Sequence, residues 1–344
     1  MTVKITLPHD NSYEIFIDEL NELYFDRKVV IITNPTVSGF HLEYLKSKLK
    51  ARELSVCTIP DGEEYKHMQT IEDMLAHCFT QRLDRKSLLV AFGGGVIGDM
   101  TGFAASIYQR GIDFVQIPTT LLSQVDASVG GKTGINNKFG KNLVGAFHQP
   151  IAVYIDPSML KTLPKREFGA GVAEIVKMAV TFNKDFFEWL EQNDLTKDEN
   201  IRVAIAKSVQ TKADVVSQDE KELGIRAALN YGHTFGHVIE NETNYDTYLH
   251  GEAVGIGMCM ANALAVKIGL MSKDEELRVK NLLEKYDIPT TYKIKDVEDF
   301  YEHFFLDKKS LDNKIKFILP IGLGICKITN EVTKNDVIEI LKGF

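Results

Sequence analysis

The first half of the chain alternates short β-branched runs with amphipathic stretches, and this alternation constrains the fold more than any other feature. Four runs have the length and composition of buried strands: KVVIIT, LSVCTIP, SLLVAF and FVQIPTT. Stretches with apolar residues at helical spacing lie between them. Strands that alternate with helices at these lengths predict a parallel sheet covered by helices. Before the first run, two alternating segments flank Asp10-Asn11-Ser12 and predict a hairpin added to the sheet.

The character of the sequence changes near Thr162-Leu163-Pro164. From there to about residue 310 the pattern is helical, and two short runs, KFILPI and GICKIT, predict a small hairpin before a last helix. A chain of 344 residues has room for roughly two domains. We therefore expect an α/β nucleotide-binding domain over residues 1–164 and a mostly helical domain over residues 165–344, with the site in a cleft between them.

The composition excludes several classes of protein. Lys and Arg number 40 and Asp and Glu 48, a formal charge of −8, and no dense basic run is present, which argues against nucleic-acid binding. The opening MTVKITLPHD lacks the apolar core of a signal peptide, and the longest apolar stretch, 253–266, is too short to span a bilayer. The four cysteines lie far apart, which favours reduced thiols. We expect a soluble cytoplasmic enzyme that does not bind membranes.

A glycine-rich turn follows the third predicted strand. Gly93, Gly95 and Gly98 fit the pattern GxGxxG between a strand and a helix, the context in which a pyrophosphate binds at a helix N-terminus. The pattern alone is weak, because it follows the third strand rather than the first and because a turn that only packs helix on strand has the same signature. Asp99, at the start of the helix, either caps it or contacts a ligand.

Two further segments of the first half point to a bound anion. Thr119 and Thr120 end the fourth strand, where hydroxyl groups face the ligand crevice of a parallel sheet. The run QVDASVGGKTGINNKFGKNLVGAF is rich in Gly, Lys and Asn, which combine close backbone approach with positive charge. The alternative is a plain surface loop, but a run of this length within a compact domain favours a functional role.

Histidines concentrate in the helical half. His233 and His237 are four residues apart and share one helix face, and His250 begins the next predicted helix. Glu174 lies in a strongly apolar helical stretch, where burying its charge is costly unless it is paired or binds a metal, and the same holds for Lys177. Two or three His with one Glu suit a catalytic Zn²⁺ with an open position, whereas an isolated histidine is more often structural. Spacing alone leaves open which of the three histidines bind it.

Other charged residues have a simpler interpretation when taken alone. Lys212 and Arg226 flank an acid-rich helical stretch and fit a solvated charged face. The triplet Asp307-Lys308-Lys309 is equally uninformative in isolation.

The motifs taken together resemble the 3-dehydroquinate synthase family. The segments that carry the resemblance, in order over roughly residues 34–322, are DGEEYK, GGGVIGD, YQRG, IPTTLLSQVDASVGGKTGIN, GKNLVGAFHQP, AEIVK, LNYGHTFGH and LHGEAVGIGM. The resemblance implies a sugar-phosphate cyclase within the broader fold of the iron-containing alcohol and glycerol dehydrogenases. It also implies bound NAD and a divalent metal, Zn²⁺ or Co²⁺.

The reaction that the resemblance implies converts 3-deoxy-D-arabino-heptulosonate 7-phosphate to 3-dehydroquinate and phosphate, the second step of the shikimate pathway of aromatic amino-acid biosynthesis. A ring hydroxyl is oxidised by NAD, phosphate leaves by elimination, the hydride returns, and an intramolecular aldol closes the carbocycle. The alternatives among enzymes are a related sugar-phosphate cyclase, a metal-dependent polyol dehydrogenase and a metal-dependent phosphatase. A non-catalytic nucleotide-binding module is the remaining alternative.

The resemblance implies roles for individual residues as well. The family's metal ligands match Glu174, His233 and His250. Its substrate-contacting and catalytic positions match Lys132, Asn142, Lys177, Lys212, Arg226, Asn230 and His237, of which His237 is the candidate for proton transfer. Its nucleotide-contacting positions match Asn34, Asp61, Gly62, Glu63, Glu64, Tyr65, Lys66, Gly94, Gly95, Val96, Ile97, Gly98, Asp99, Thr119, Thr120, Asp126, Lys132, Lys141, Met159, Leu160, Lys161 and Thr162. Either Lys308 or Lys309 matches a further substrate-contacting lysine. A phosphate-contacting arginine of the partner subunit matches Arg110, which implies a homodimer.

Overall fold

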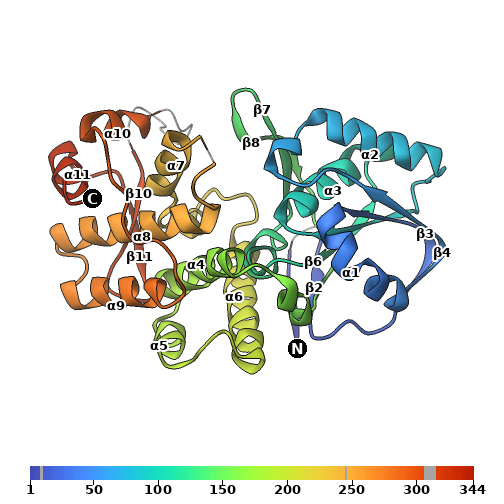
Figure 1. Ribbon diagram of the computed structural model, residues 1–344, viewed down its shortest axis with the longest axis horizontal. Helices are drawn as coiled ribbons and strands as arrows, with labels where there is room; N and C mark the ends of the chain where they lie inside the picture. Colours follow the sequence, from blue (N-terminus) through green and yellow to red (C-terminus); the bar gives the residue numbers. More distant parts are fainter. Residues whose placement is uncertain (8–10, 245, 306–314) are drawn as a thin grey trace. The chain divides into compact units, whose positions relative to one another are not determined.

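The computed structural model describes residues 1–7, 11–244, 246–305 and 315–344 (Figure 1). The chain forms two compact units. The first comprises Met1–Leu163 and Ile201–Lys221, and the second comprises Pro164–Asn200 and Glu222–Phe344. Apart from Pro164 at the boundary, this division differs from the one expected from the sequence in residues 201–221, which pack with the first unit.

Most of helix α6 (Asp198–Gln218) belongs to this segment. Arg202 on α6 donates a hydrogen bond to Asp18 Oδ1 at 3.0 Å, and the backbone N–H of Thr6 donates to Ser217 Oγ at 3.4 Å. These partners are 184 and 211 positions apart along the chain. A division of the sequence into two continuous parts cannot anticipate contacts of this range.

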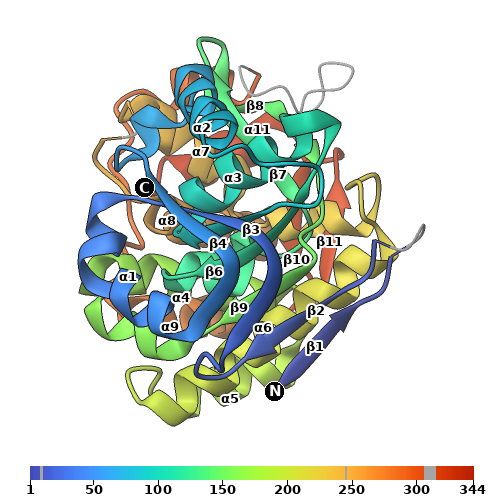
Figure 2. The same ribbon diagram turned by 90° about the vertical axis from the view of Figure 1, so that its right-hand side faces the viewer.

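The first unit is built on a seven-stranded sheet. Its strands are β1 (Thr2–Ile5), β2 (Tyr13–Ile17), β3 (Leu23–Thr33), β4 (Leu49–Thr58), β5 (Leu88–Gly93), β6 (Asp113–Pro118) and β9 (Ala152–Ile155). They lie in the order β1-β2-β9-β6-β5-β3-β4, with the β1–β2 hairpin at one edge (Figure 2). All neighbouring pairs are parallel except β1 and β2. The parallel sheet and the added hairpin predicted from the sequence are confirmed.

The strand order creates a place for a ligand. From β3 the chain passes to β4 on one side and then to β5 on the other, so the order reverses between β3 and β5. In open parallel sheets, ligands bind at the carboxyl ends of the strands beside such a switch point. The glycine turn leaves β5 here and begins helix α3 (Gly95–Ile107). Its position after the third parallel strand is therefore the one that this topology requires.

Helices cover both faces of the sheet. Successive residues of a strand point to opposite faces. Val30 and Leu89 accordingly belong to a core shared with α2 (Met68–Thr80) and α3, whereas Val29 and Val90 belong to a second core shared with α1 (Pro35–Lys48). Burial on both faces is the reason that these strands read as continuous apolar runs in the sequence.

The Gly-, Lys- and Asn-rich run is regular structure rather than a plain loop, so that alternative is wrong. Residues Ser123–Ala127 form a π-helical turn, and β7 (Lys132–Asn137) pairs antiparallel with β8 (Gly140–Phe147). The strands approach so closely that a Cβ on Gly145 would overlap the carbonyl oxygen of Thr133. The sequence did not predict this hairpin, because glycine is unusual within a strand. Here the glycines are needed for the close approach of the two strands.

The second unit is mostly helical, as predicted. Its helices are α4 (Lys165–Phe182), α5 (Lys184–Gln192), α7 (His233–Glu242), α8 (His250–Lys267), α9 (Lys273–Glu284), α10 (Val297–His303) and α11 (Lys334–Leu341). Strands β10 (Phe317–Pro320) and β11 (Cys326–Thr329) form the predicted hairpin. The helical pattern predicted from residue 164 onward is interrupted at Gly232, which adopts a left-handed φ of 82° between a 3₁₀ turn (Ile225–Asn230) and α7. Within the described residues, every helix is too short or too polar to cross a membrane.

Candidate active site

In the first unit, the predicted nucleotide-contacting residues gather at the carboxyl edge of the sheet. Gly94 precedes α3 and supplies no side chain to cap it, so the first N–H groups of this helix are available to an anion. Asn34 follows β3, and its side-chain N–H donates to Asp61 Oδ1, after β4, at 2.7 Å. Thr119, which directly follows β6, donates its backbone N–H to the Gly93 carbonyl at 3.0 Å. These contacts place the ends of four neighbouring strands around one glycine turn.

A buried lysine connects three of the predicted segments. Lys66 is 4% exposed, and its Nζ donates to Asp99 Oδ2 and to Asn142 Oδ1, both at 2.6 Å. Burial alone would lower the pKa of Lys66, but the negative charges of Asp99 and Glu63 overcome that effect and raise it. The ammonium group of Lys66 thus joins the DGEEYK segment to the start of α3 and to strand β8.

Lys212 and Arg226 do not form a solvated charged face, so that interpretation is wrong. Lys212 on α6 is buried in the first unit, where its Nζ contacts Asp126 through the carboxylate at 2.6 Å and the carbonyl oxygen at 2.5 Å. Arg226 is 1% exposed within the second unit. Nearby, Asn230 donates to Glu222 Oε1 at 2.5 Å. Charges buried in this way need fixed partners or a ligand.

Arg110 is separated from the glycine turn of its own chain, where the nucleotide is predicted to bind. It follows the C-terminal end of α3, whose 13 residues place it roughly 20 Å from the glycine turn. Arg110 is exposed, and both Gln109 and Arg110 adopt left-handed backbone conformations, with φ of 53° and 69°. Such strained conformations cluster where a side chain has to be held in a particular place.

In the second unit, three predicted metal ligands come together from three helices. Glu174 lies on α4, His233 begins α7 and His250 begins α8. Nε2 of each histidine lies 3.9 Å from Glu174 Oε1, and one ligand atom from each residue lies within 4.8 Å of the others. This ligand set and spacing are typical of a zinc site with a further position open to substrate.

The environment of Glu174 fits a bound cation. The residue is fully buried, and within the described part of the chain neither carboxylate oxygen makes a hydrogen bond. Lys177, one turn later, contacts one of the oxygens as an ion-pair partner. A buried carboxylate without hydrogen bonds is costly, and a divalent cation between Glu174 and the two imidazoles would offset that cost.

Glycines allow the three helices to approach closely enough. A Cβ on Gly251, beside His250, would overlap the carbonyl oxygen of Ala170 on α4. A Cβ on Gly257 of α8 would overlap the carbonyl oxygen of Gly232, which precedes α7. The glycines of LHGEAVGIG are thus required by helix packing, and that packing brings Glu174 to the histidines.

The second ring nitrogen of each of these two histidines, His233 and His250, has its own partner. His233 Nδ1 lies 3.2 Å from the carbonyl oxygen of Tyr231, and His250 Nδ1 lies 3.2 Å from Glu240 Oε1. Burial alone would lower the pKa of His250, but the hydrogen bond and charge of Glu240, with the charge of Glu174, raise it. The ring of His237 stands beside both, with centroids 5.5 Å from His233 and 6.3 Å from His250.

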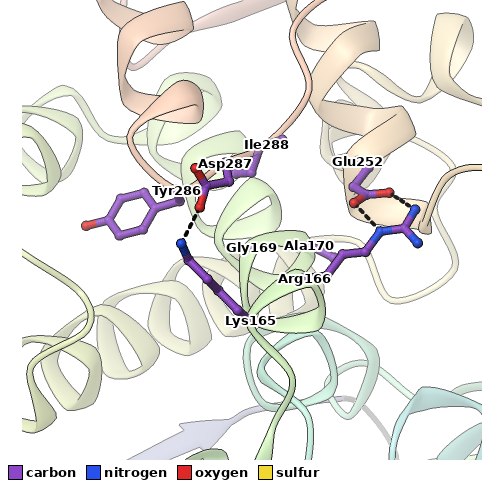
Figure 3. A pocket seen from close by; sticks show the side chains of 8 residues that line it. All are labelled: Lys165, Arg166, Gly169, Ala170, Glu252, Tyr286, Asp287 and Ile288. Carbon is purple, nitrogen blue, oxygen red and sulfur yellow. Dashed lines mark hydrogen bonds and ion pairs between the residues drawn. The ribbon is translucent and has the colours of Figure 1, made fainter.

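A cavity of about 350 Å³ lies between the start of α4 and the start of α8 (Figure 3). On one side Arg166 makes two parallel hydrogen bonds to Glu252, each 2.6 Å long. On the other, Lys165 pairs with Asp287 at 2.5 Å. Glu252 also accepts from the backbone N–H of Leu249, so this clamp fixes the turn that precedes His250.

A second group of potential ligands, Glu242, Asp299 and His303, also lies in the second unit. Two of its members already have partners: Tyr292 donates to Glu242 Oε2 at 2.7 Å, and His303 Nδ1 lies 3.4 Å from Glu242 Oε1. Asp299 is exposed. We interpret the group as an ion-pair network between α7 and α10. The predicted lysines Lys308 and Lys309 lie outside the described residues.

Comparison with known proteins identifies the family. The profile of the 3-dehydroquinate synthase N-terminal domain matches residues 56–170, and that of the C-terminal domain matches residues 171–310. The 3-dehydroquinate synthase of Sulfurovum sp. (strain NBC37-1) is 64% identical over 346 residues, which cover 100% of this chain and 99% of that protein. The chain belongs to the 3-dehydroquinate synthase family. Synthesis of 3-dehydroquinate is accordingly its activity, as the motifs imply.

Solved structures of other cyclases have the same fold as this 3-dehydroquinate synthase family member. The 2-epi-5-epi-valiolone synthase from Streptomyces hygroscopicus subsp. jinggangensis 5008, with NAD⁺ and Zn²⁺ bound, is 26% identical, with a TM-score of 0.87 over 99% of both chains. A 2-deoxy-scyllo-inosose synthase complexed with carbaglucose-6-phosphate, NAD⁺ and Co²⁺ is 25% identical, with a TM-score of 0.86 over 100% of this chain and 99% of that one. An iron-containing alcohol dehydrogenase, 13% identical with a TM-score of 0.60 over 95% of this chain and 98% of that one, shares the fold alone. The predicted fold class is confirmed.

Sequence reasoning missed two features of the site. One is the buried bridge from Lys66 to Asp99 and Asn142, whose members are 33 and 76 positions from the lysine. The other is Glu240, which carries a signal in the sequence: in HTFGHVIE it follows His233 by seven residues and so shares its helix face. A glutamate on the apolar face of a short helix is unusual, and this pattern could have identified Glu240 as a candidate site residue.

Proposed function

We propose that the chain converts 3-deoxy-D-arabino-heptulosonate 7-phosphate to 3-dehydroquinate and phosphate with NAD and a divalent cation, Zn²⁺ or Co²⁺. The single observation that carries this proposal is that the buried carboxylate of Glu174 and the imidazoles of His233 and His250 converge from three helices. When bound, the cation would polarise a ring oxygen of the substrate, and NAD would accept and return a hydride.

The residues of the second unit would bind the anionic substrate and move protons beside the metal ligands. Lys177 and Arg226 are buried cations, and Asn230 offers an amide on the 3₁₀ turn before α7. Such groups suit a phosphate or a carboxylate, and loss of one buried charged partner is expected to cost about 2–5 kcal/mol of binding. An imidazole nitrogen of His237, adjacent to both ligand histidines, would exchange the proton of the oxidised hydroxyl.

The residues of the first unit would hold the nucleotide and part of the substrate. The N-terminus of α3 and the glycine turn suit a pyrophosphate, and the contacts from Asn34 to Asp61 and from Lys66 to Asp99 support a nucleotide at this edge of the sheet. The residues that would contact the nucleotide are Asn34, Asp61 to Lys66, Asp99, Thr119, Thr120, Lys141 and Met159 to Thr162. Lys132, Asn142 and Lys212 would contact the substrate, and Asp126, which holds Lys212, the nicotinamide end of the nucleotide.

The deciding experiment supplies the heptulosonate phosphate, NAD and Zn²⁺ to the purified protein and measures phosphate and the carbocyclic product. We expect both in equal amounts, with no net NADH. Phosphate without 3-dehydroquinate would contradict the proposal. NADH in proportion to product would identify a dehydrogenase, and full activity after removal of NAD would identify a phosphatase.

We further propose a homodimer in which Arg110 contacts the substrate phosphate bound by the partner subunit. The exposure of Arg110 and its distance along α3 from the glycine turn support this proposal. Mixed dimers of His250→Ala and Arg110→Ala chains should regain activity, because one of the two sites then has both residues intact. No recovery in proven mixed dimers would contradict a shared site.

A further inference from the structure

The carboxylate of Glu240 contacts His250, one of the proposed metal ligands. We propose that Glu240 is a positioning residue, which fixes the ring orientation and the tautomer of His250 so that Nε2 of the imidazole faces Glu174. This inference deepens the proposed function and rests on the metal site that it contains.

The geometry on the two sides of the His250 ring carries the argument. Nδ1 lies 3.2 Å from Glu240 Oε1, and Nε2 lies 3.9 Å from Glu174 Oε1. A neutral imidazole carries one proton, and a carboxylate can only accept a hydrogen bond. Glu240 therefore keeps that proton on Nδ1, which leaves the lone pair of Nε2 directed toward Glu174. A carboxylate that orients a ligand histidine through its second nitrogen also makes the histidine a better ligand.

The other ligand histidine shows why His250 needs a side chain for this purpose. His233 Nδ1 faces the carbonyl oxygen of Tyr231 two residues earlier, which the turn before α7 provides. His250 is the first residue of α8, and its partner comes from a different helix. Glu240 is 5% exposed, although a glutamate is rarely buried without a fixed partner. The contact therefore joins α7 to α8 at the metal site.

The same helix offers a matched control. Glu242 is two residues further along α7, and its carboxylate contacts Tyr292 and His303 rather than a proposed ligand. Replacing either glutamate by glutamine removes one negative charge and keeps the size of the side chain. A difference between Glu240→Gln and Glu242→Gln thus reports the contact with His250 and not a general effect on α7.

The test is a titration of the metal-free, full-length protein with Co²⁺ and with Zn²⁺ in competition with a chromogenic chelator. We expect one tight site per wild-type chain, roughly 10- to 100-fold weaker binding in Glu240→Gln, and binding within about threefold of wild type in Glu242→Gln. The visible absorption bands of bound Co²⁺ should change in Glu240→Gln and coincide with those of wild type in Glu242→Gln. Glu240→Ala should bind at least as weakly as Glu240→Gln, and if it fails to fold, the glutamine variant decides.

Each contrary result has its own meaning. A Glu240→Gln variant with wild-type metal affinity and wild-type Co²⁺ bands would overturn the positioning role and leave the proposed function intact. Equal losses in Glu240→Gln and Glu242→Gln would also overturn it, because the effect would then belong to the helix. A wild-type chain that binds no metal would overturn the proposed metal site, and the positioning role with it.

Discussion

The two units build their predicted sites from different parts of the chain. In the first unit, the backbone supplies the site: a glycine turn and the N-terminus of α3 lie at the switch point of a parallel sheet. In the second, side chains supply it, since Glu174, His233 and His250 converge from three helices. A site made of backbone groups depends on topology, whereas one made of side chains depends on close helix packing and on each residue's charge. The predictions below test this difference.

Removal of one proposed metal ligand, Glu174, from the second unit is expected to have the largest effect. Glu174→Gln removes the buried charge, and kcat/KM for phosphate release should fall at least about 10³-fold, or about 4 kcal/mol of transition-state stabilisation. Chelator-treated wild-type protein should lose activity equally and regain it with Zn²⁺, whereas Glu174→Gln should regain none. If Glu174→Gln kept its metal and its activity within tenfold of wild type, the proposed metal site would not depend on the carboxylate of Glu174.

Two glycines allow helix packing to be compared with ligand approach. Alanine at Gly251 would overlap the backbone of Ala170, so Gly251→Ala should lower the free energy of unfolding by about 3 kcal/mol. Alanine at Gly98 in α3 would meet only the end of the Gln116 side chain, which can move, so Gly98→Ala should stay within about 1 kcal/mol of wild type. Urea unfolding measures both. Equal losses would mean that the glycines of both units serve packing.

Lys66 is an exception in the first unit, because here a charged side chain, and not the backbone, connects parts of the predicted site. Lys66→Met removes the partner of Asp99 and should lower the free energy of unfolding by about 2–3 kcal/mol, because a largely buried carboxylate is left without its cation. Lys28→Met breaks a more exposed pair with Glu53 and should cost less than about 1 kcal/mol. If Lys66→Met lowered the free energy of unfolding as little as Lys28→Met does, the buried charge of Lys66 would not be important for the stability of the first unit.

The smallest expected effect concerns Asp156, which anchors the turn after β9 in the first unit. Tyr44 donates to Asp156 Oδ2 at 2.8 Å, and burial, with this hydrogen bond, raises the pKa of Tyr44 to about 12. Tyr44→Phe should lower the free energy of unfolding by about 1 kcal/mol at pH 8.

The sign of the pH dependence of this contact follows from the raised pKa. In the unfolded chain the phenol ionises near pH 10, whereas in the folded protein it keeps its proton to about pH 12. The stabilisation is therefore complete below pH 10 and is lost as the pH rises from 10 to 12. Unfolding measured at pH 8 and pH 11 should show the difference between wild type and Tyr44→Phe shrinking. A difference that grows with pH would contradict the assigned contact.

Some elements could be predicted from local pattern because local physics decides them. The strands of the parallel sheet were visible as apolar runs, since helices bury both of their faces. His233 and His237 were correctly assigned to one helix by their spacing, and the motif LHGEAVGIGM placed His250 at the start of the next. In contrast, Gly145 and Gly251 were ambiguous, because a glycine needed for backbone contact has the same sequence signature as a flexible one.

The sequence by itself determined, through its motifs, the family to which the chain belongs, and it predicted the candidate site residues. The tertiary structure alone decided their partners: Lys66 bridges Asp99 and Asn142, Lys212 is buried against Asp126, and Glu240 contacts His250. The physical reason is range. Periodicity and capping act within a few residues, whereas each of these partners meets only after separate elements have packed, and in most cases after dozens of intervening positions have been placed.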